Sequence, residues 1–521
     1  MEVKNKYILL AITIAVLFVQ FWISLDSYTH DFYARCDSAW YFLGAKGFMA
    51  GMRPYVDFTD VKGPLLWLIF GIGHTISNTT YLGIFWVSIV TYTWTIYMCY
   101  KTFALFFDQM TSLLASFIML FFVFNPIVHL APEAENFCEP AIVTSIYIFV
   151  KWLKSREYID NRFVKISSFL LGILFSWPLL IKFTMSVMLL IVPFMMLCYY
   201  IKSQNYKQLI LLIEYYAFGA FVLILPFVVY LMYKDSLASF LYEYFIYAPK
   251  TTASSLSGTF IQYVHEILTL FCLRGLNFKI IYVVAALSPL LVFKNDKFSK
   301  YSLAIASLWF VFLSIHRDMG YYLCASNWVF ISFVIALLSH CKSFITKTTK
   351  LVILLIIPLM VVAINRPWNH PSFFTKSELR KDYYDCAFYM SQAERPKMID
   401  YECFDFGLGL LSDALPGCKR FALPYNYLKG DELDQKEAIK KGIPDFIVCN
   451  KGNSKYIEDH GYVYYAKYYR WDNNWDDKIE YWLYGRPGLR KPQIDIYPSN
   501  VDVLFKKKVV FEKNYSYAAI R

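Results

Sequence analysis

The sequence predicts a polytopic α-helical membrane protein with a small α/β domain at its carboxyl-terminal end. Of its 521 residues, 57% are hydrophobic and only 17% are charged, whereas about a quarter of the residues of a soluble domain are charged. The apolar residues come in blocks of roughly 17–25, the length that a helix needs to cross a hydrocarbon core about 30 Å thick. These blocks end near residue 366, where the sequence becomes rich in Lys, Asp, Tyr and Pro.

The blocks predict about eleven membrane-spanning helices. Lys4 and Lys6 precede the first block, as in a signal peptide, but the apolar run is too long and no small-x-small cleavage site follows, so we expect a retained helix. The expected helices are residues 7–25, 81–103, 111–130, 139–153, 166–182, 183–201, 209–233, 278–293, 300–315, 321–340 and 345–364.

The segment 64–77, PLLWLIFGIGHTIS, is short for a span and is interrupted by glycine. If it does not cross, the basic loops, including 151–165, face the cytoplasm and the acidic loop 132–139 faces the opposite side. If it crosses, nearly all those basic residues lie outside. Loop charge therefore predicts a half-inserted juxtamembrane helix at 64–77, a cytoplasmic amino terminus and an extracytoplasmic carboxyl domain, in a membrane that we expect to be the bacterial inner (plasma) membrane.

The boundary near residue 366 predicts two domains, a transmembrane domain at 1–365 and an extracytoplasmic α/β domain at 366–521. About 150 residues are enough for one small domain. Strand-like runs stand between turn signals at 445–450 (DFIVCN) and 501–511 (VDVLFKKKVVF),.

Eleven cysteines show no zinc-ligand spacing. Under the predicted topology Cys403 and Cys418 face an oxidising compartment, and the turn-rich GLGLLSDALPG between them suggests a disulfide bridge,.

With this topology, the unusual polar residues converge on one membrane face. Acids and cations gathered there indicate a site for an anionic, membrane-borne substrate. The net charge of +11 is concentrated in short loops that set orientation, so we expect no nucleic-acid partner. The candidates are Asp37, Tyr41, Arg53, Asp57, Asp60, Lys62, Glu133, Glu135, Glu139, Lys182, His316 and Arg317.

Sugar transfer from a lipid phosphate would use both kinds of group. Lys or Arg stabilises the charge that develops on a phosphate leaving group, and a carboxylate removes the proton of an acceptor hydroxyl. Asp37 is the first candidate for this base. It opens the run WYFLGAKGFM, which we expect to form an amphipathic helix in the membrane plane,.

The stretch 35–66, RCDSAWYFLGAKGFMAGMRPYVDFTDVKGPLL, combines an acid, an aromatic helix, G-x-x-P-Y-x-D and K-G-P-L-L. This order resembles the first extracytoplasmic loop of PMT-like and lipid A aminoarabinose-transferase-like glycosyltransferases of the GT-C class. The resemblance extends over about residues 1–360, through APEAENFCEP at 131–140 and HRDMGYYL at 316–323.

This resemblance implies transfer of a sugar from a polyprenyl-phosphate donor to a glycan, lipid or protein acceptor, with inversion. Asp37 matches the family's catalytic acid, and Glu135 or Glu139 matches the acid of its second loop. Lys62 matches the lysine of the family's K-G-P-L element, and the likeness together with topology assigns Lys182, His316 and Arg317 to the donor phosphate. Tyr41, Arg53, Asp57, Asp60 and Glu133 complete the substrate site.

Ser38 follows Asp37 where many family members have a second acid, and Gly63 replaces a proline. Both differences weaken a metal-binding interpretation, so no cofactor is assigned and a divalent metal remains open.

Two other classes of function remain open. A transporter or flippase of a lipid-linked saccharide would show inverted repeats and charges at mid-membrane, whereas most spans here have uncharged centres. A noncatalytic scaffold for envelope assembly would use the carboxyl domain for binding. Glu139 could also serve only a helix amino terminus, and Lys182 could extend to the interface.

Overall fold

The computed structural model describes most of the chain. The residues outside the description are 1, 25, 28–35, 125–131, 256–275, 294–295, 316–325, 342–345, 366–384, 388, 391–392, 404–406, 424–427, 429, 472–477, 488 and 490–521. The chain forms two compact units. The first comprises Met1–Thr29, Trp86–Val229 and Gly258–Pro367, and the second comprises His30–Phe85, Tyr230–Ser257 and Trp368–Arg521.

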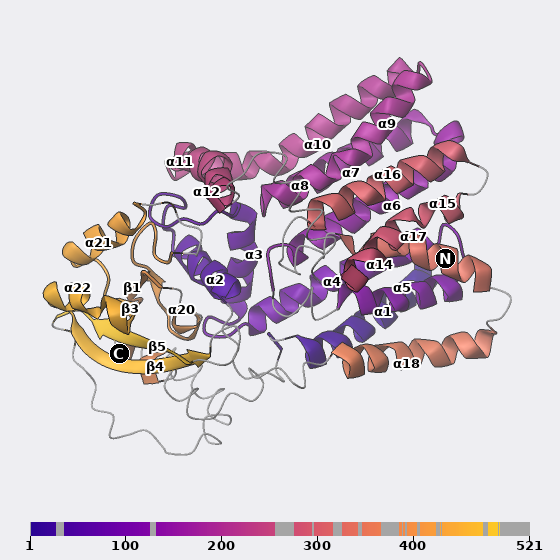
Figure 1. Cartoon of the computed structure of the whole chain (residues 1–521). Coiled ribbons are helices and arrows are strands. Elements are labelled where there is room, and N and C mark those ends of the chain that lie inside the picture. Colours follow the sequence, from indigo (N-terminus) through magenta and orange to yellow (C-terminus); the bar gives the residue numbers. More distant parts are fainter. Residues whose placement is uncertain are drawn as a thin grey trace. The chain divides into compact units, whose positions relative to one another are not determined.

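The first unit is a bundle of helices (Figure 1). Every span expected from the sequence corresponds to a helix or to two successive helices. These are α1 (Glu2–Ile23), α4 (Leu82–Phe103), α5 (Gln109–Val123), α6 (Glu139–Ser155), α7 (Asn161–Leu179), α8 (Phe183–Leu189), α9 (Ile191–Lys202), α10 (Tyr206–Tyr233), α14 (Leu276–Leu287), α15 (Pro289–Val292), α16 (Lys297–Ile315), α17 (Val329–Cys341) and α18 (Lys347–Asn365), with short 3-10 turns at Asn136–Cys138 and Arg156–Tyr158.

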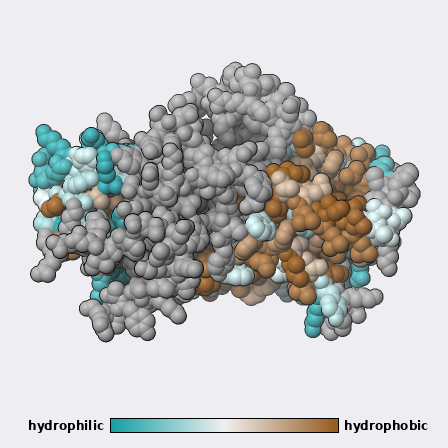
Figure 2. All heavy atoms as spheres, turned by 90° about the horizontal axis from the view of Figure 1, so that it is seen from below, coloured by the Kyte–Doolittle hydropathy of each residue, from teal (hydrophilic) through white to brown (hydrophobic). Residues whose placement is uncertain are grey.

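Membrane-spanning character follows from length and apolar composition. Among the described residues, six helical segments are long and apolar enough to cross a membrane: Asn5–Ile23, Leu82–Phe103, Asn161–Leu179, Phe183–Lys202, Tyr206–Tyr233 and Thr348–Asn365. Figure 2 shows apolar side chains gathered on the surface of the helices. The chain is therefore an integral membrane protein with several spanning helices, as its sequence predicts.

Helix boundaries follow local capping. The Asp108 side chain accepts a hydrogen bond from the Thr111 N–H at the start of α5, and Asp160 accepts one from Phe163 N–H at the start of α7. Such caps satisfy backbone donors that have no partner within the helix. Hydropathy suggests that this helix starts at residue 166. Because Asp160 is its amino-terminal cap, α7 begins earlier, at Asn161.

Two glycines permit close contact between α7 and α10. A Cβ atom at Gly172 would lie 2.0 Å from the Tyr216 carbonyl oxygen, and one at Gly219 would lie 2.0 Å from the Phe169 oxygen. No larger residue fits either position without separating the helices. Small residues serve this purpose in membrane bundles, where close van der Waals packing drives association.

The second unit combines short helices with a mixed sheet. Its helices are α2 (Cys36–Met49), α3 (Pro64–Ile76), α11 (Leu237–Tyr242), the π-helix η3 (Glu243–Tyr247), α12 (Ala248–Ser255), α20 (Leu408–Leu411), α21 (Glu432–Lys440), the 3-10 turn η6 (Lys451–Asn453) and α22 (Ser454–Asp459). Its strands are β1 (Lys397–Tyr401), β2 (Leu415–Pro416), β3 (Phe446–Asn450), β4 (Val463–Trp471) and β5 (Lys478–Gly485).

The sheet has the strand order β2-β1-β3-β5-β4. β1 runs parallel to β2 and β3, whereas β5 is antiparallel to β3 and β4. The predicted strand at 445–450 is confirmed as β3, and the predicted α/β character is confirmed with it. The strand expected at 501–511 lies outside the described residues. Cys403 and Cys418 are both free thiols, so the structure contains no bridge between them.

α2 contains the run WYFLGAKGFM, for which we expect an amphipathic helix, but this helix is enclosed on more than one side. Residues 41–47 are all buried, including the charged Lys46. α2 packs against α3 on one side and against α20 and β2 on another. The sequence pattern of α2 could not show that α20 and β2, far along the chain, cover a second face of the helix.

α3 has 13 residues, about 20 Å of helix, which is short of the roughly 30 Å of a hydrocarbon core. Pro64 begins the helix and Ser77 ends it. This length supports the juxtamembrane interpretation of 64–77, which stays a prediction.

Candidate functional site

The predicted site residues that the structure describes fall into two groups, one in each unit. His316 and Arg317 lie outside the described residues. In the second unit, Asp37 lies in the first turn of α2 with its side chain partly exposed. A helix amino terminus stabilises a carboxylate in this position. Asp37 is therefore an ionisable side chain that solvent can reach, as the predicted role of general base requires,.

Lys62 lies directly before α3. Its ammonium group is 5.2 Å from the ring centroid of Tyr41, within the range of a cation–π contact,. Its carbonyl oxygen accepts a 2.8 Å hydrogen bond from the Tyr55 hydroxyl. The sequence Lys62-Gly63-Pro64 produces this arrangement because Gly63 is the extended amino-terminal cap and proline suits the first helical turn,. The structure thus brings the predicted residues Tyr41 and Lys62 together.

Arg53 and Asp57 pair with each other. The Arg53 side chain donates to Asp57 at 2.8 and 3.1 Å, and its backbone N–H donates at 2.8 Å. Burial raises the pKa of Asp57, but the hydrogen bonds from Arg53 outweigh it and hold that pKa below its ordinary value. Asp60 is only 3% exposed, and its Oδ1 accepts from the Val61 N–H. These contacts assign the three residues a part in shaping the loop between α2 and α3.

The second group lies in the first unit, where Glu133, Glu135 and Glu139 are each at most 2% exposed. Glu135 forms an ion pair with Lys182, which lies between α7 and α8. The Trp177 indole N–H donates to the Phe137 carbonyl at 2.8 Å and fixes the acidic loop to the end of α7. The structure thus brings the second acidic loop and Lys182 together.

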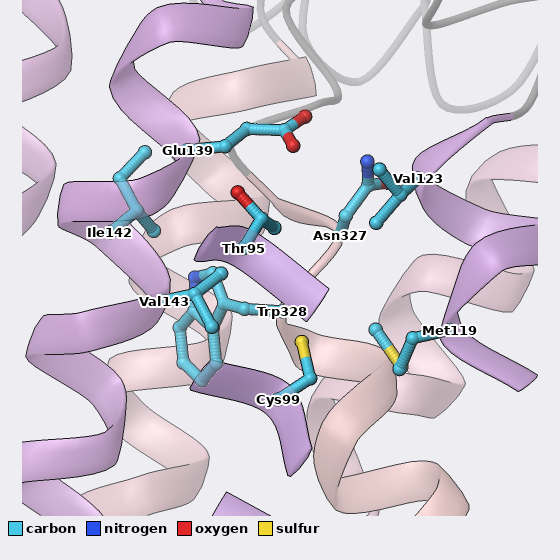
Figure 3. A pocket seen from close by; sticks show the side chains of 9 residues that line it. All are labelled: Thr95, Cys99, Met119, Val123, Glu139, Ile142, Val143, Asn327 and Trp328. Atoms are coloured by element: carbon cyan, nitrogen blue, oxygen red, sulfur yellow. The ribbon is translucent and has the colours of Figure 1, made fainter. Parts of the chain in front are cut away.

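Glu139 begins α6 and lines a small pocket (Figure 3). The cavity is about 10 Å³ in volume, and its lining residues are Thr95, Cys99, Met119, Val123, Glu139, Ile142, Val143, Asn327 and Trp328.

The Glu139 oxygens make no hydrogen bond of good geometry with the described residues. The Tyr282 hydroxyl donates to Asn327 Oδ1 at 3.1 Å, and Figure 3 shows the Asn327 nitrogen on the side of the pocket where the carboxylate lies. A buried carboxyl group without such a bond is costly to maintain, so Glu139 remains a functional candidate.

Sequence reasoning missed two buried polar residues near the predicted site residues. Asn327 lies beside Glu139, and Lys46 lies in α2 with Asp37 and Tyr41. Lys46 stands as an isolated charged residue in the apolar and aromatic run FLGAKGFM, and Asn327 follows Ser326 in ASNWVF; these polar interruptions of apolar runs were the available signal. Lys46 is 1% exposed. Burial lowers its pKa to about 7, and the charge of Asp413 opposes this shift.

Metal binding has no support from side-chain clustering. Within the part of the chain that the structure describes, no three His, Cys, Asp or Glu residues are grouped to hold an ion. The dependence on a metal stays open.

The fold of the chain matches solved structures. No protein-family model matches the sequence, and no curated protein matches it. ArnT from Cupriavidus metallidurans bound to undecaprenyl phosphate superposes with a TM-score of 0.57 at 11% identity, covering 93% of this chain and 98% of that one. The apo state of the same protein gives a TM-score of 0.56 at 10% identity over the same shares of the two chains. The chain therefore has the GT-C glycosyltransferase fold of ArnT, the fold class that its sequence predicts.

Proposed function

We propose that this protein is a membrane glycosyltransferase that transfers a sugar from a polyprenyl-phosphate carrier to a glycan, lipid or protein acceptor on the non-cytoplasmic face. The observation that carries this proposal is the ArnT fold over nearly the whole chain, because one of the matched ArnT structures is bound to undecaprenyl phosphate. The residues at the predicted site suit a lipid phosphate. Each of its two groups contains acids and a lysine.

The proposed reaction is an inverting displacement at the anomeric carbon. Asp37 removes the proton of the acceptor hydroxyl, whose oxygen bonds to the anomeric carbon as the bond from that carbon to the phosphate oxygen breaks. Polyprenyl phosphate leaves with the electron pair. Lys62 and Lys182 stabilise its negative charge, and Arg317 is proposed as a third contact because its guanidinium can bind phosphate in a bidentate manner.

The structure suggests how Lys182 is held for this task. Its ion pair with Glu135 fixes an ammonium group that carries three N–H donors,. Because the Glu135 carboxylate holds the Lys182 ammonium group on one side, the direction of that group is set before the phosphate binds. We therefore propose orientation of Lys182 as the role of Glu135, and direct contact with substrate as the role of Asp37.

The decisive substitution is Asp37→Asn in the full-length protein. We expect turnover to fall by about 10²–10⁴-fold, the usual contribution of positioned proton transfer, while undecaprenyl phosphate still binds. The assay measures release of undecaprenyl phosphate from the lipid-linked sugar that accumulates in cells lacking the protein. Glu437→Gln is the matched control, because that carboxylate is exposed and pairs with Lys441, one turn further along the chain.

Near wild-type turnover in Asp37→Asn would remove Asp37 from the mechanism. A flippase would give a different result, because the purified protein would move the lipid-linked sugar between leaflets without releasing undecaprenyl phosphate. A scaffold would show neither activity.

A further inference from the structure

Lys46 connects α2 to the carboxyl-terminal part of the second unit. Its ammonium group donates to the carbonyl oxygens of Gly409 at 2.8 Å and Leu410 at 3.1 Å, and also to that of Ser412. α20 spans Leu408–Leu411, so these oxygens belong to its carboxyl-terminal end, where helix carbonyls lack partners within the helix,. The three N–H groups of one ammonium match three acceptors.

The same side of α2 makes the remaining contacts with this region. The Trp40 and Phe421 rings meet edge to face with centroids 6.1 Å apart. A Cβ atom on Gly409 would lie 3.1 Å from Leu43, and one on Gly47 would lie 3.1 Å from Pro416. Neither glycine position leaves room for α2 to move closer.

These contact residues follow helical spacing. Trp40, Leu43 and Gly47 are spaced by three and four residues and therefore lie on one side of α2, with Lys46 beside them,. Asp37 lies about 2.5 turns before Lys46, so the two side chains leave opposite sides of the helix. Lys46 lies nine residues from Asp37 in sequence, about 14 Å along the axis, so any rotation or sliding at Lys46 is transmitted to Asp37 by the helix.

The opposite side of α2 is held by α3. A Cβ atom on Gly44 would lie 3.1 Å from the Trp67 indole nitrogen, and the Tyr41 ring meets Phe70 with centroids 5.5 Å apart. These are packing contacts, which constrain direction less strictly than hydrogen bonds do. The hydrogen bonds from Lys46 to the end of α20 are directional and therefore define one position of α2 along its axis,.

We infer that the carboxyl-terminal domain is a positioning element of the proposed catalytic site, and that Lys46 sets the position of the Asp37 carboxylate by fixing α2 to the end of α20. This inference rests on the proposed function. Lys46 acts through Asp37 and does not contact the substrate.

A double-mutant cycle in the full-length protein in lipid nanodiscs tests this role. Lys46→Met keeps the length of the side chain and removes all three hydrogen bonds. We expect it to lower kcat by about 10–100-fold, the effect of displacing a catalytic group by about 1 Å, with undecaprenyl phosphate binding changed less than about twofold. Lys436→Met is the matched control, because Lys436 in α21 is partly exposed and pairs with Glu402.

The cycle is completed in the Asp37→Asn background, with residual turnover measured at enzyme excess. If Lys46 acts only through Asp37, the double variant turns over within about twofold of Asp37→Asn alone. A structural defect would instead multiply the two losses, and that result would overturn the inference, as would wild-type kcat in Lys46→Met. If Lys46→Met does not fold, Gly47→Ala displaces the neighbouring contact of α2 with Pro416 and is judged by the same two comparisons.

Failure of the proposed function has a different signature. In that case wild-type protein releases no undecaprenyl phosphate, or Asp37→Asn is as active as wild type. If Asp37→Asn abolishes turnover and only the cycle fails, the proposed function stands without the positioning role.

Discussion

Two lysines with little solvent exposure, one in each unit, are held in different ways. Lys182 in the first unit pairs with the carboxylate of Glu135, whereas Lys46 in the second unit donates to three backbone carbonyls. In the first arrangement the two charges cancel. In the second, hydrogen bonds are satisfied, but burial of the ammonium group lowers its pKa. The comparison shows that Lys182 is held by the side chain of Glu135, whereas Lys46 is held by the backbone of a distant segment.

The largest expected effect is a loss of stability when the ion pair between Glu135 and Lys182 is broken. Glu135→Gln leaves Lys182 as a buried cation without its counter-charge, and breaking such a pair costs about 3–5 kcal/mol of stability. We expect a marked fall in melting temperature in nanodiscs. Because desolvation of both ions offsets their attraction, Glu135→Gln combined with Lys182→Met should recover most of that loss. A double variant as unstable as the sum of the two single variants would show that the residues do not act as a pair.

The second prediction concerns the net charge of Lys46. Its folded pKa is about 7, below the ordinary value near 10.4 for an unfolded chain. Between about pH 7 and 10 the unfolded state binds more protons, so this group makes stability rise with pH, by at most about 1.4 kcal/mol per pH unit. Below pH 7 both states hold the proton and its contribution is constant.

Melting temperatures measured from pH 6 to 9.5 check this slope. Asp413 opposes the shift of the Lys46 pKa. Burial, and after it the charge of Lys46, lowers the pKa of His74 on α3. We expect Lys46→Met to flatten the profile above pH 7, with Lys436→Met as the control. Identical slopes in wild type and Lys46→Met would show that Lys46 remains charged throughout the range.

The smallest effect on stability is expected at an exposed ion pair between a basic and an acidic side chain, that of Arg53 and Asp57. The Arg53 and Asp57 side chains are 49% and 30% exposed and 2.8 Å apart. Exposed ion pairs contribute about 0–1 kcal/mol, so Arg53→Ala should change the melting temperature little, and raised salt should reduce even that change. A loss as large as that of Glu135→Gln would mean that exposure does not separate the two pairs.

Much of the helical unit was predictable because a membrane helix is specified locally. Apolar length gives the spans, and residues such as Asp108 and Asp160 mark helix starts by side-chain capping. The candidate site was predictable where its residues are close in sequence, as with Tyr41 and Lys62, or where charge pointed to one loop, as with Glu135. The partner of Glu135 was anticipated only as a member of the same site, since no sequence rule pairs it with Lys182.

The sequence by itself determined the membrane class, the order of the spans, the presence of an α/β domain and the acids and lysines from which a phosphate site could be built. Those features depend on hydrophobicity and on neighbours a few residues away. Only the tertiary structure decided that α2 is enclosed and that Lys46 binds the carbonyl of Gly409, 363 positions further along the chain. Backbone carbonyls have no sequence signature, since every residue carries one. Which of them face a buried lysine depends on how distant segments pack.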